Sequence, residues 1–251
     1  MMNKAASIPK SITEAEGWWC EVEEHKAGSA FPAHYHEMDE WLSVTDGDIT
    51  FTDTSGRTLP IVLSTGDCLE IPAGDVHSVR VGPSGAKYAM WTPQQTSSEF
   101  MKLLSSLTPC GYSLGDKEMA KLVSINFEIP RLENRFRTNL EARDALDDII
   151  HKSLLFRRAD GKIIGKDIFL PPPEKNANAT GAGPSLHRYR SSGFELIHVT
   201  NESAVVSIHV HTIQQDGTII IRRKTRNIRT FVMEASGWQC KLWVNFPVLE
   251  I

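Results

Sequence analysis

Two short blocks of histidine, glycine and acidic residues constrain this chain more than any other feature. The first block spans residues 28–47 and the second spans residues 66–77. In the first block one residue separates His34 from His36, so on a β-strand both imidazoles leave the same face. Glu40 follows closely and adds a carboxylate from the same strand or from its continuation. The first block therefore predicts a group of side chains that can bind a metal ion.

The second block adds a third imidazole. His77 follows Pro72-Ala-Gly74, a turn sequence that redirects the chain before a strand rich in valine begins. Together with His34, His36 and Glu40, it makes a mixed set of nitrogen and oxygen ligands. Such a set suits iron, manganese, nickel, copper, cobalt or zinc. We therefore expect one divalent transition-metal ion per chain.

The spacing of these residues resembles the two motifs of the cupin superfamily. The first block fits G-x5-H-x-H-x3-E-x6-G from Gly28 to Gly47, and the second fits G-x5-P-x-G-x2-H from Gly66 to His77. The second motif departs only at Val81, where the family usually has an asparagine that is not a ligand. The resemblance implies an all-β cupin barrel, a double-stranded β-helix or jelly roll, with the metal in its mouth.

Other side chains of the first block are weaker ligand candidates. Glu37 and Asp39 are rival carboxylates, but the spacing favours Glu40. Tyr35 alternates away from its histidine neighbours on a strand, so we expect it to face solvent or an outer core.

Length and composition favour a soluble protein of two domains. The chain has 251 residues, 41% hydrophobic and 23% charged, as in globular proteins that form two domains of ordinary size. A net charge of -4 provides no general attraction to nucleic acid or to anionic membranes, so we expect neither as a partner. The four cysteines are widely scattered, which indicates reduced thiols. We therefore expect a cytoplasmic protein.

The first hundred residues predict a series of strands at hairpin spacing. Apolar and β-branched runs mark strands near residues 18–22, 41–44, 49–52, 59–63, 68–71, 78–81 and 87–91. Asp46-Gly47 predicts a tight turn between the second and third of these, because glycine adopts the positive φ that such a turn requires.

Beyond residue 96 the hydrophobic period becomes helical. We expect a short helix at 97–105, a domain boundary between residues 108 and 109, and helices at 116–126, 131–140 and 144–150. Ile129-Pro130 predicts an interruption between the first two of the later helices. Long strands follow, which argues for an α+β domain.

Residues 113–251 resemble the nuclear-transport-factor-like (NTF2-like) superfamily, which includes SnoaL-like proteins. The resemblance rests on a hairpin at 158–165, a strand ending in His209-Val-His211, and a final hairpin at 229–243. It implies that residues 109–251 form an α+β cone with a pocket, often dimerising through its sheet, so we expect a homodimer. Residues 171–184 are rich in turn formers, and we interpret them as an insertion rather than a lid.

His209 and His211 form a candidate pocket site in this second half. They share a strand face with Ser207, where they could contact a ligand or act as general bases. The alternative is that this face is solvated or dimeric, and we favour that interpretation.

We expect a metal-binding cupin protein that acts on a small organic molecule as a metal-dependent dioxygenase or isomerase, with no catalytic side chain assigned. One alternative is a non-enzymatic protein that binds or senses a small molecule and holds a structural metal. Another places the chemistry in the NTF2-like pocket.

Overall fold

A computed structural model describes residues 2–14, 17–93, 101–107, 114–136, 139–171, 186–216 and 219–248. The chain divides into two compact units, and the division runs through one helix. The first unit contains residues 1–108 and 115–124, and the second contains residues 109–114 and 125–251. In the part of the chain that is described, every helix is too short or too polar to span a bilayer.

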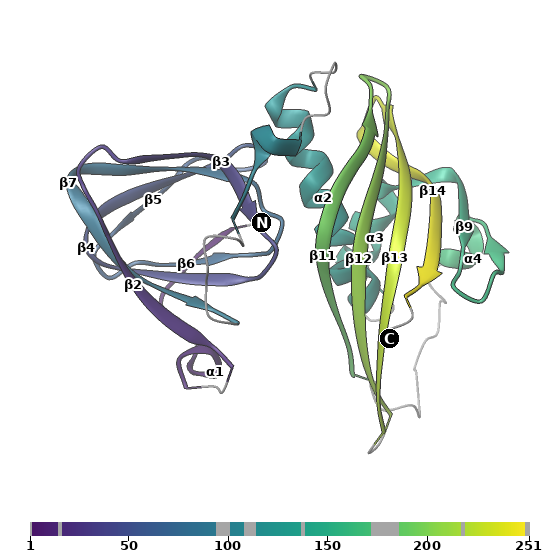
Figure 1. Ribbon diagram of the computed structural model, residues 1–251, viewed down its shortest axis with the longest axis horizontal. Helices are drawn as coiled ribbons and strands as arrows, with labels where there is room; N and C mark the ends of the chain where they lie inside the picture. Colours follow the sequence, from purple (N-terminus) through teal and green to yellow (C-terminus); the bar gives the residue numbers. More distant parts are fainter. Residues whose placement is uncertain are drawn as a thin grey trace. The chain divides into compact units, whose positions relative to one another are not determined.

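The first unit is a sheet that curls back on itself (Figure 1). Its described strands run in the order β1-β6-β4-β7-β3-β8, with β2 added on β7 and β5 on β4. The strands are β1 (Asn3–Ala5), β2 (Trp19–His25), β3 (Ala30–His36), β4 (Glu40–Asp53), β5 (Ile61–Ser64), β6 (Cys68–Ile71), β7 (His77–Thr92) and β8 (Met101–Leu103). A short helix α1 (Lys10–Thr13) and a 3-10 helix η2 (Leu104–Leu107) complete it.

Strand β4 shows how the core of this unit forms. Alternate residues such as Leu42 and Val44 are buried, as expected for a sheet with one apolar face. Beyond Val44 the register with β7 shifts, and the buried positions become Ile49 and Phe51. These side chains form the apolar interior above which the histidines of the two sequence blocks lie.

The tight turn predicted at Asp46-Gly47 is wrong. Strand β4 continues through both residues, and Gly47 has a φ of 75° inside the strand. A Cβ at Gly47 would overlap the carbonyl oxygen of Gly85, which lies across the sheet on β7. The glycine therefore permits an irregular, close pairing of β4 with β7, and it does not reverse the chain.

The short helix predicted at 97–105 is also wrong at residues 101–103, whereas Leu104 and Ser105 lie in the 3-10 helix η2. Residues 97–100 lie outside the described residues, and Met101–Leu103 form β8, which pairs with β3 at His34–His36. Pairing with a strand that lies far away in sequence satisfies the backbone of β8, and it overrides the local helical pattern.

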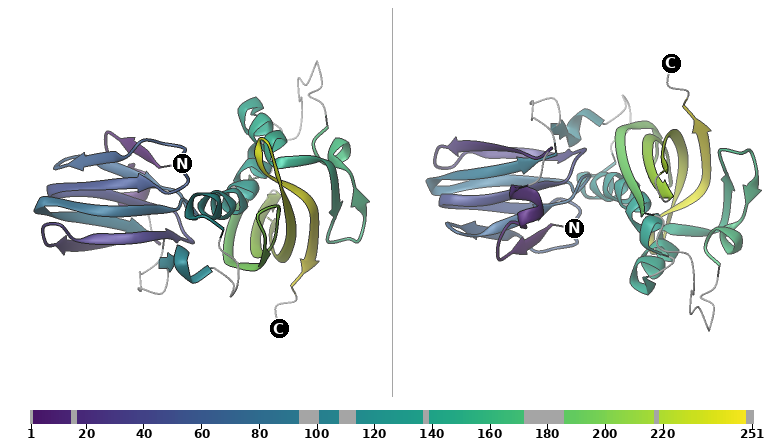
Figure 2. Two further views of the ribbon diagram at one scale, coloured as in Figure 1. Left: turned by 90° about the horizontal axis from the view of Figure 1, so that it is seen from above. Right: turned by 90° about the horizontal axis from the view of Figure 1, so that it is seen from below.

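The second unit consists of helices followed by long antiparallel strands. The described sheet has the order β10-β9-β14-β13-β12-β11, and only β9 and β14 pair in parallel. Figure 2 shows how strongly β11 to β14 curve. The elements are α2 (Asp116–Arg135), α3 (Leu140–Ile149), β9 (Ile150–Arg157), β10 (Ile163–Ile164), α4 (Lys166–Phe169), β11 (Leu186–Val199), β12 (Ser203–Asp216), β13 (Ile219–Glu234) and β14 (Gly237–Pro247).

The helix interruption predicted at Ile129-Pro130 does not occur, because α2 is continuous through Pro130. A proline has no N–H, so the carbonyl of Asn126 loses the donor that position 130 would otherwise supply. The guanidinium of Arg229 replaces it, since Nη1 donates to Asn126 O at 3.0 Å and to Asn126 Oδ1 at 3.1 Å. Arg229 is fully buried on β13, an interior strand, so it is not part of a charged sheet edge.

Candidate metal centre

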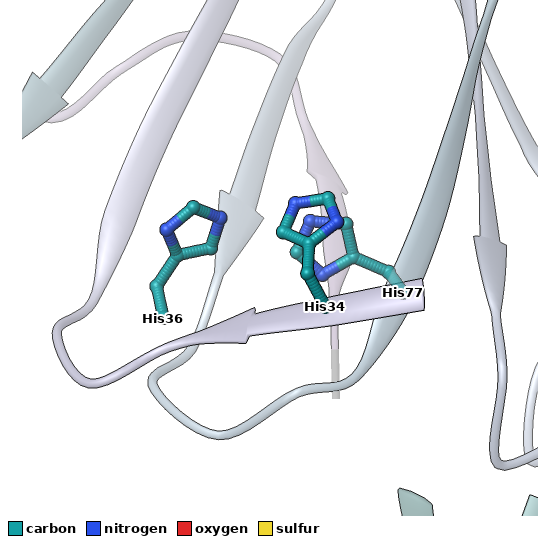
Figure 3. Close-up of side chains that lie close together, drawn as sticks. All are labelled: His34, His36 and His77. Carbon is teal, nitrogen blue, oxygen red and sulfur yellow. The ribbon is translucent and has the colours of Figure 1, made fainter. Parts of the chain in front are cut away.

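The predicted ligands lie at the end of one strand and at the starts of two others. His34 and His36 lie at the end of β3, His77 begins β7, and Glu40 begins β4. Strands β3 and β7 pair at His34 and His77, which places these two imidazoles side by side. The three imidazoles gather in one place, as Figure 3 shows.

An irregularity in β3 sets the direction of its side chains. The register between β3 and β7 shifts between Phe31 and His34. In a regular strand Phe31 and His34 would point to opposite faces, but both line the same cavity. The shift therefore allows an aromatic side chain and two imidazoles from one short strand to share the interior.

The three imidazoles are close enough to share one ion. Ligand nitrogens of His34, His36 and His77 all lie within 4.8 Å of one another. The ring centroids of His34 and His77 are 4.5 Å apart, and those of His34 and His36 are 5.1 Å apart. His34 and His77 are buried and His36 is half-buried.

Backbone carbonyls orient the two buried rings. Nδ1 of His34 lies 2.7 Å from the carbonyl oxygen of Pro32, and Nδ1 of His77 lies 2.8 Å from that of Asp75. Because a carbonyl only accepts, each Nδ1 carries the proton and each neutral ring leaves Nε2 with a free lone pair. This is the tautomer that a metal-binding histidine needs.

Burial keeps these rings neutral. It lowers the pKa of His34 to about 4, with a further decrease from His36, against opposing effects of the Pro32 carbonyl and of Glu40. Burial, followed by His34 and His36, also holds the pKa of His77 well below its usual value. Both imidazoles are therefore neutral at neutral pH, with Nε2 unprotonated and able to act as a ligand atom.

Glu40 supplies the observation that tests whether an ion fits here. Its Oε1 lies 3.0 Å from Nδ1 of His36, but the direction is not that of a hydrogen bond. This oxygen is buried, and among the described residues it has no hydrogen-bond partner. Burying an unpartnered carboxylate oxygen is costly, and a cation would remove that cost. The donor set therefore fits a divalent transition metal.

The other carboxylates of the first block have different surroundings. Asp39 is exposed, and its Oδ1 accepts a hydrogen bond of 2.8 Å from the backbone N–H of Ala73, which ties the two sequence blocks together. Tyr35 is buried on the face of β3 that points away from the imidazoles, in agreement with the outer-core expectation. Glu37 is half-buried and does not line the cavity.

A cavity of about 310 Å³ opens beside the imidazoles. Its volume is in the range of sites for small molecules. Its described lining includes His34, His36, His77 and Glu40. Much of the remaining wall is apolar and includes Phe31, Leu42, Ile49, Phe51, Val79 and Met90.

A second group of polar side chains, which was not predicted from the sequence, lines the same cavity. Tyr88 on β7 donates its hydroxyl to Glu23 Oε2 on β2 at 2.8 Å, and Nε2 of His25 lies 2.9 Å from the same oxygen. Glu21 also lines the cavity. The alternation of Glu21, Glu23 and His25 was the available signal, because residues two apart share a strand face.

His209 and His211 lie in the second unit, on β12. Their neighbours Ile208 and Val210 are buried on one face of the strand, and the two half-buried histidines lie on the other. Nε2 of His211 lies 3.2 Å from the hydroxyl of Ser192 on β11. A ligand pocket at these histidines stays a prediction.

The cupin character of the first unit has independent support. Residues 21–91 match the Cupin_2 family, described as a cupin domain. No curated protein sequence matches the chain.

Solved structures resemble each half of the chain separately. A cupin-2 domain protein from Shewanella frigidimarina is 21% identical, with a TM-score of 0.28, over 32% of this chain and 72% of its own. The DMSP lyase DddQ from Ruegeria pomeroyi is 20% identical, with a TM-score of 0.31, over 36% of this chain and 44% of its own. An NTF2-like protein from Rhodospirillum rubrum is 19% identical, with a TM-score of 0.38, over 50% of this chain and 98% of its own. These likenesses assign no activity to this chain.

Proposed function

We propose that the first unit binds one divalent transition-metal ion through His34, His36, His77 and Glu40 and acts on a small organic molecule in the adjoining cavity. One observation carries the proposal: two oriented, neutral imidazoles, a third imidazole and a buried carboxylate that has an oxygen without a hydrogen-bond partner among the described residues all line the same cavity. We assign the activity to the oxygenase or isomerase class.

The residues of the site support this role in separate ways. Hydrogen bonds from Nδ1 to backbone carbonyls hold His34 and His77 in one orientation. The two rings therefore lose little conformational freedom when a metal ion binds. Much of the wall is apolar, and an apolar wall strengthens electrostatic interactions beside it. When bound, the ion would act as a Lewis acid toward an oxygen of the substrate, and a redox-active ion would also support chemistry with dioxygen.

Metal analysis of protein purified without chelators tests the proposal. We expect about one equivalent of metal per chain, and loss of most of it in His34→Ala and His77→Ala variants, because each removes a ligand. His209→Ala in the second unit is the matched control and retains the metal. Trace metal that is not restored by iron, manganese, nickel, copper, cobalt or zinc would contradict the proposal.

A structural ion is the second candidate, since His34 and His77 are paired across two strands and an ion there would link them. His36→Ala separates the two roles. Loss of turnover with an unchanged melting temperature supports an enzyme. A lower melting temperature in a protein that has no turnover with any substrate tested supports a structural ion.

A further inference from the structure

The wall formed by β2 and the later part of β7 carries the polar side chains of the cavity other than the imidazoles and Glu40. Three of its side chains are polar, namely Glu21, Glu23 and Tyr88. Apart from the imidazoles, the described lining contains no lysine, arginine, serine, threonine, asparagine or glutamine. The polar part of this wall therefore lacks any cationic side chain.

The hydroxyl of Tyr88 does not change this. Its hydrogen is directed to Glu23 Oε2 at 2.8 Å, so the phenol oxygen can only accept a hydrogen bond from a ligand. Tyr88 is buried, and burial together with the charges of Glu23 and Glu40 raises its pKa, which keeps the hydroxyl protonated. The three side chains thus offer acceptor atoms to a ligand and no free donor.

The charge of the cavity points the same way. Its described lining holds three carboxylates, Glu21, Glu23 and Glu40, and no lysine or arginine. His25 lies behind Glu23, with Nε2 at 2.9 Å from its Oε2, and it does not line the cavity. Carboxylates on a wall without a lysine or arginine favour a cationic ligand over an anionic one.

Aromatic rings in the wall add to the preference for a cationic ligand. The rings of Phe31, Phe51 and Tyr88 all line the cavity. Aromatic rings attract ammonium groups that lie over their faces, and the attraction increases where water is excluded.

We propose that the cavity takes a small molecule that carries an amino group or another cationic group, bound at Glu23, Glu21 and Tyr88, together with an oxygen atom directed to the imidazoles. Only the contact between the ligand oxygen and the imidazoles rests on the proposed function. The acidic wall and the aromatic rings are present whether or not an ion is bound.

Three probes of equal chain length test the proposal: 4-amino-1-butanol, 1,4-butanediol and 4-hydroxybutyrate. Each keeps one hydroxyl, and the other end is cationic, neutral or anionic. We expect dissociation constants, measured by NMR titration of the metal-loaded protein at fixed ionic strength, to favour the ammonium probe over the carboxylate probe by about tenfold or more, the size of one charged hydrogen bond.

Glu23→Gln removes one charge and keeps an oxygen that can accept from Tyr88. We expect it to reduce the ammonium preference several-fold, whereas Glu24→Gln, on the opposite, exposed face of β2, leaves it unchanged. Equal or tighter binding of the carboxylate probe overturns the proposal, and so does a preference that Glu23→Gln does not alter.

Metal content, measured first, separates this result from the proposed function. If the protein binds no metal, the same titration is made on the metal-free protein. An ammonium preference that depends on Glu23 then supports the ligand class even though the metal proposal has failed, and its absence overturns the ligand class as well.

Discussion

At the scale of single residues, the same local contact prepares both buried histidines. His34 and His77 each direct Nδ1 to the backbone carbonyl two residues earlier, that of Pro32 in one case and of Asp75 in the other. The chain thereby selects the tautomer through its own backbone, and no carboxylate among the described residues accepts from Nδ1 of either ring. The sequence predicts these residues as ligands, but it cannot show which tautomer they adopt, because the direction of a carbonyl depends on backbone angles.

The backbone N–H that Pro130 lacks accounts for one contact of the buried Arg229 guanidinium in the second unit. Pro130 lacks an N–H, and Arg229 donates to the Asn126 carbonyl that this N–H would have reached. The guanidinium also lies 4.4 Å from the ring of Trp243, and its Nη2 donates to Asn227 at 3.2 Å. Arg229 therefore compensates for the proline and allows α2 to continue.

This pairing predicts that the two positions are coupled. Arg229→Met removes the two hydrogen bonds that Nη1 donates to Asn126 O and Oδ1, and we expect it to lower the free energy of unfolding by about 1–3 kcal/mol. Pro130→Ala restores the N–H, so it should recover about 1 kcal/mol in the Arg229→Met background. Urea titrations of the four proteins measure the cycle, with the exposed Arg223→Met as control. Additive effects would contradict the coupling.

At the scale of elements, irregular pairing builds the site. The register shift in β3 directs Phe31 and His34 to one side, and the shifts around Gly47 change which side chains of β4 face the interior. Neither shift follows from period-two alternation. The sequence predicted a turn at Asp46-Gly47 because glycine adopts the positive φ of a tight turn, and the structure has that φ inside β4. Gly47 correctly indicated an unusual backbone conformation. The close approach of Gly85 explains why a glycine is needed there.

Substitution of Gly47 by alanine should consequently destabilise the protein more than the same substitution at an ordinary turn glycine. Gly66 also has a positive φ, of 94°, but a Cβ there meets no atom within 4 Å. We expect Gly66→Ala to lower the free energy of unfolding by about 1 kcal/mol, and Gly47→Ala to lower it by about 2–4 kcal/mol, since overlap with Gly85 adds to the backbone strain. Thermal or urea unfolding of both variants measures the difference. Equal losses would show that the pairing of β4 with β7 accommodates a side chain.

The remaining elements show how far local patterns extend. The helical pattern of α2 and α3 and the hairpin that joins β9 to β10 were predicted from periodicity and turn residues. The helical pattern near residue 101 gave a wrong prediction, because β8 pairs with β3, which lies far away in the sequence. The acidic wall at Glu23 and Tyr88 was missed for the same reason, since β2 and β7 pair across a long separation in sequence.

At the scale of the whole molecule, a sheet that curls on itself carries the candidate metal centre, and a second, mixed unit follows it. We keep residues 1–108 and 109–251 as the proposed domains, although α2 contributes residues to both compact units. Dimerisation and a cytoplasmic location stay predictions, and so does a role for His209 and His211. The spacing of the two blocks was sufficient to predict that His34, His36 and His77 come together, and a metal bound there stays a prediction.

X-ray absorption spectroscopy of the metal-loaded protein tests the central claim most directly. We predict a first shell with scattering from three imidazole rings and at least one oxygen, at about 2.0–2.2 Å if the ion is zinc. In the His77→Ala variant, the imidazole contribution should fall from three rings to two or be lost together with the metal. An ion surrounded by oxygen alone, or a spectrum that His77→Ala leaves unchanged, would contradict the account.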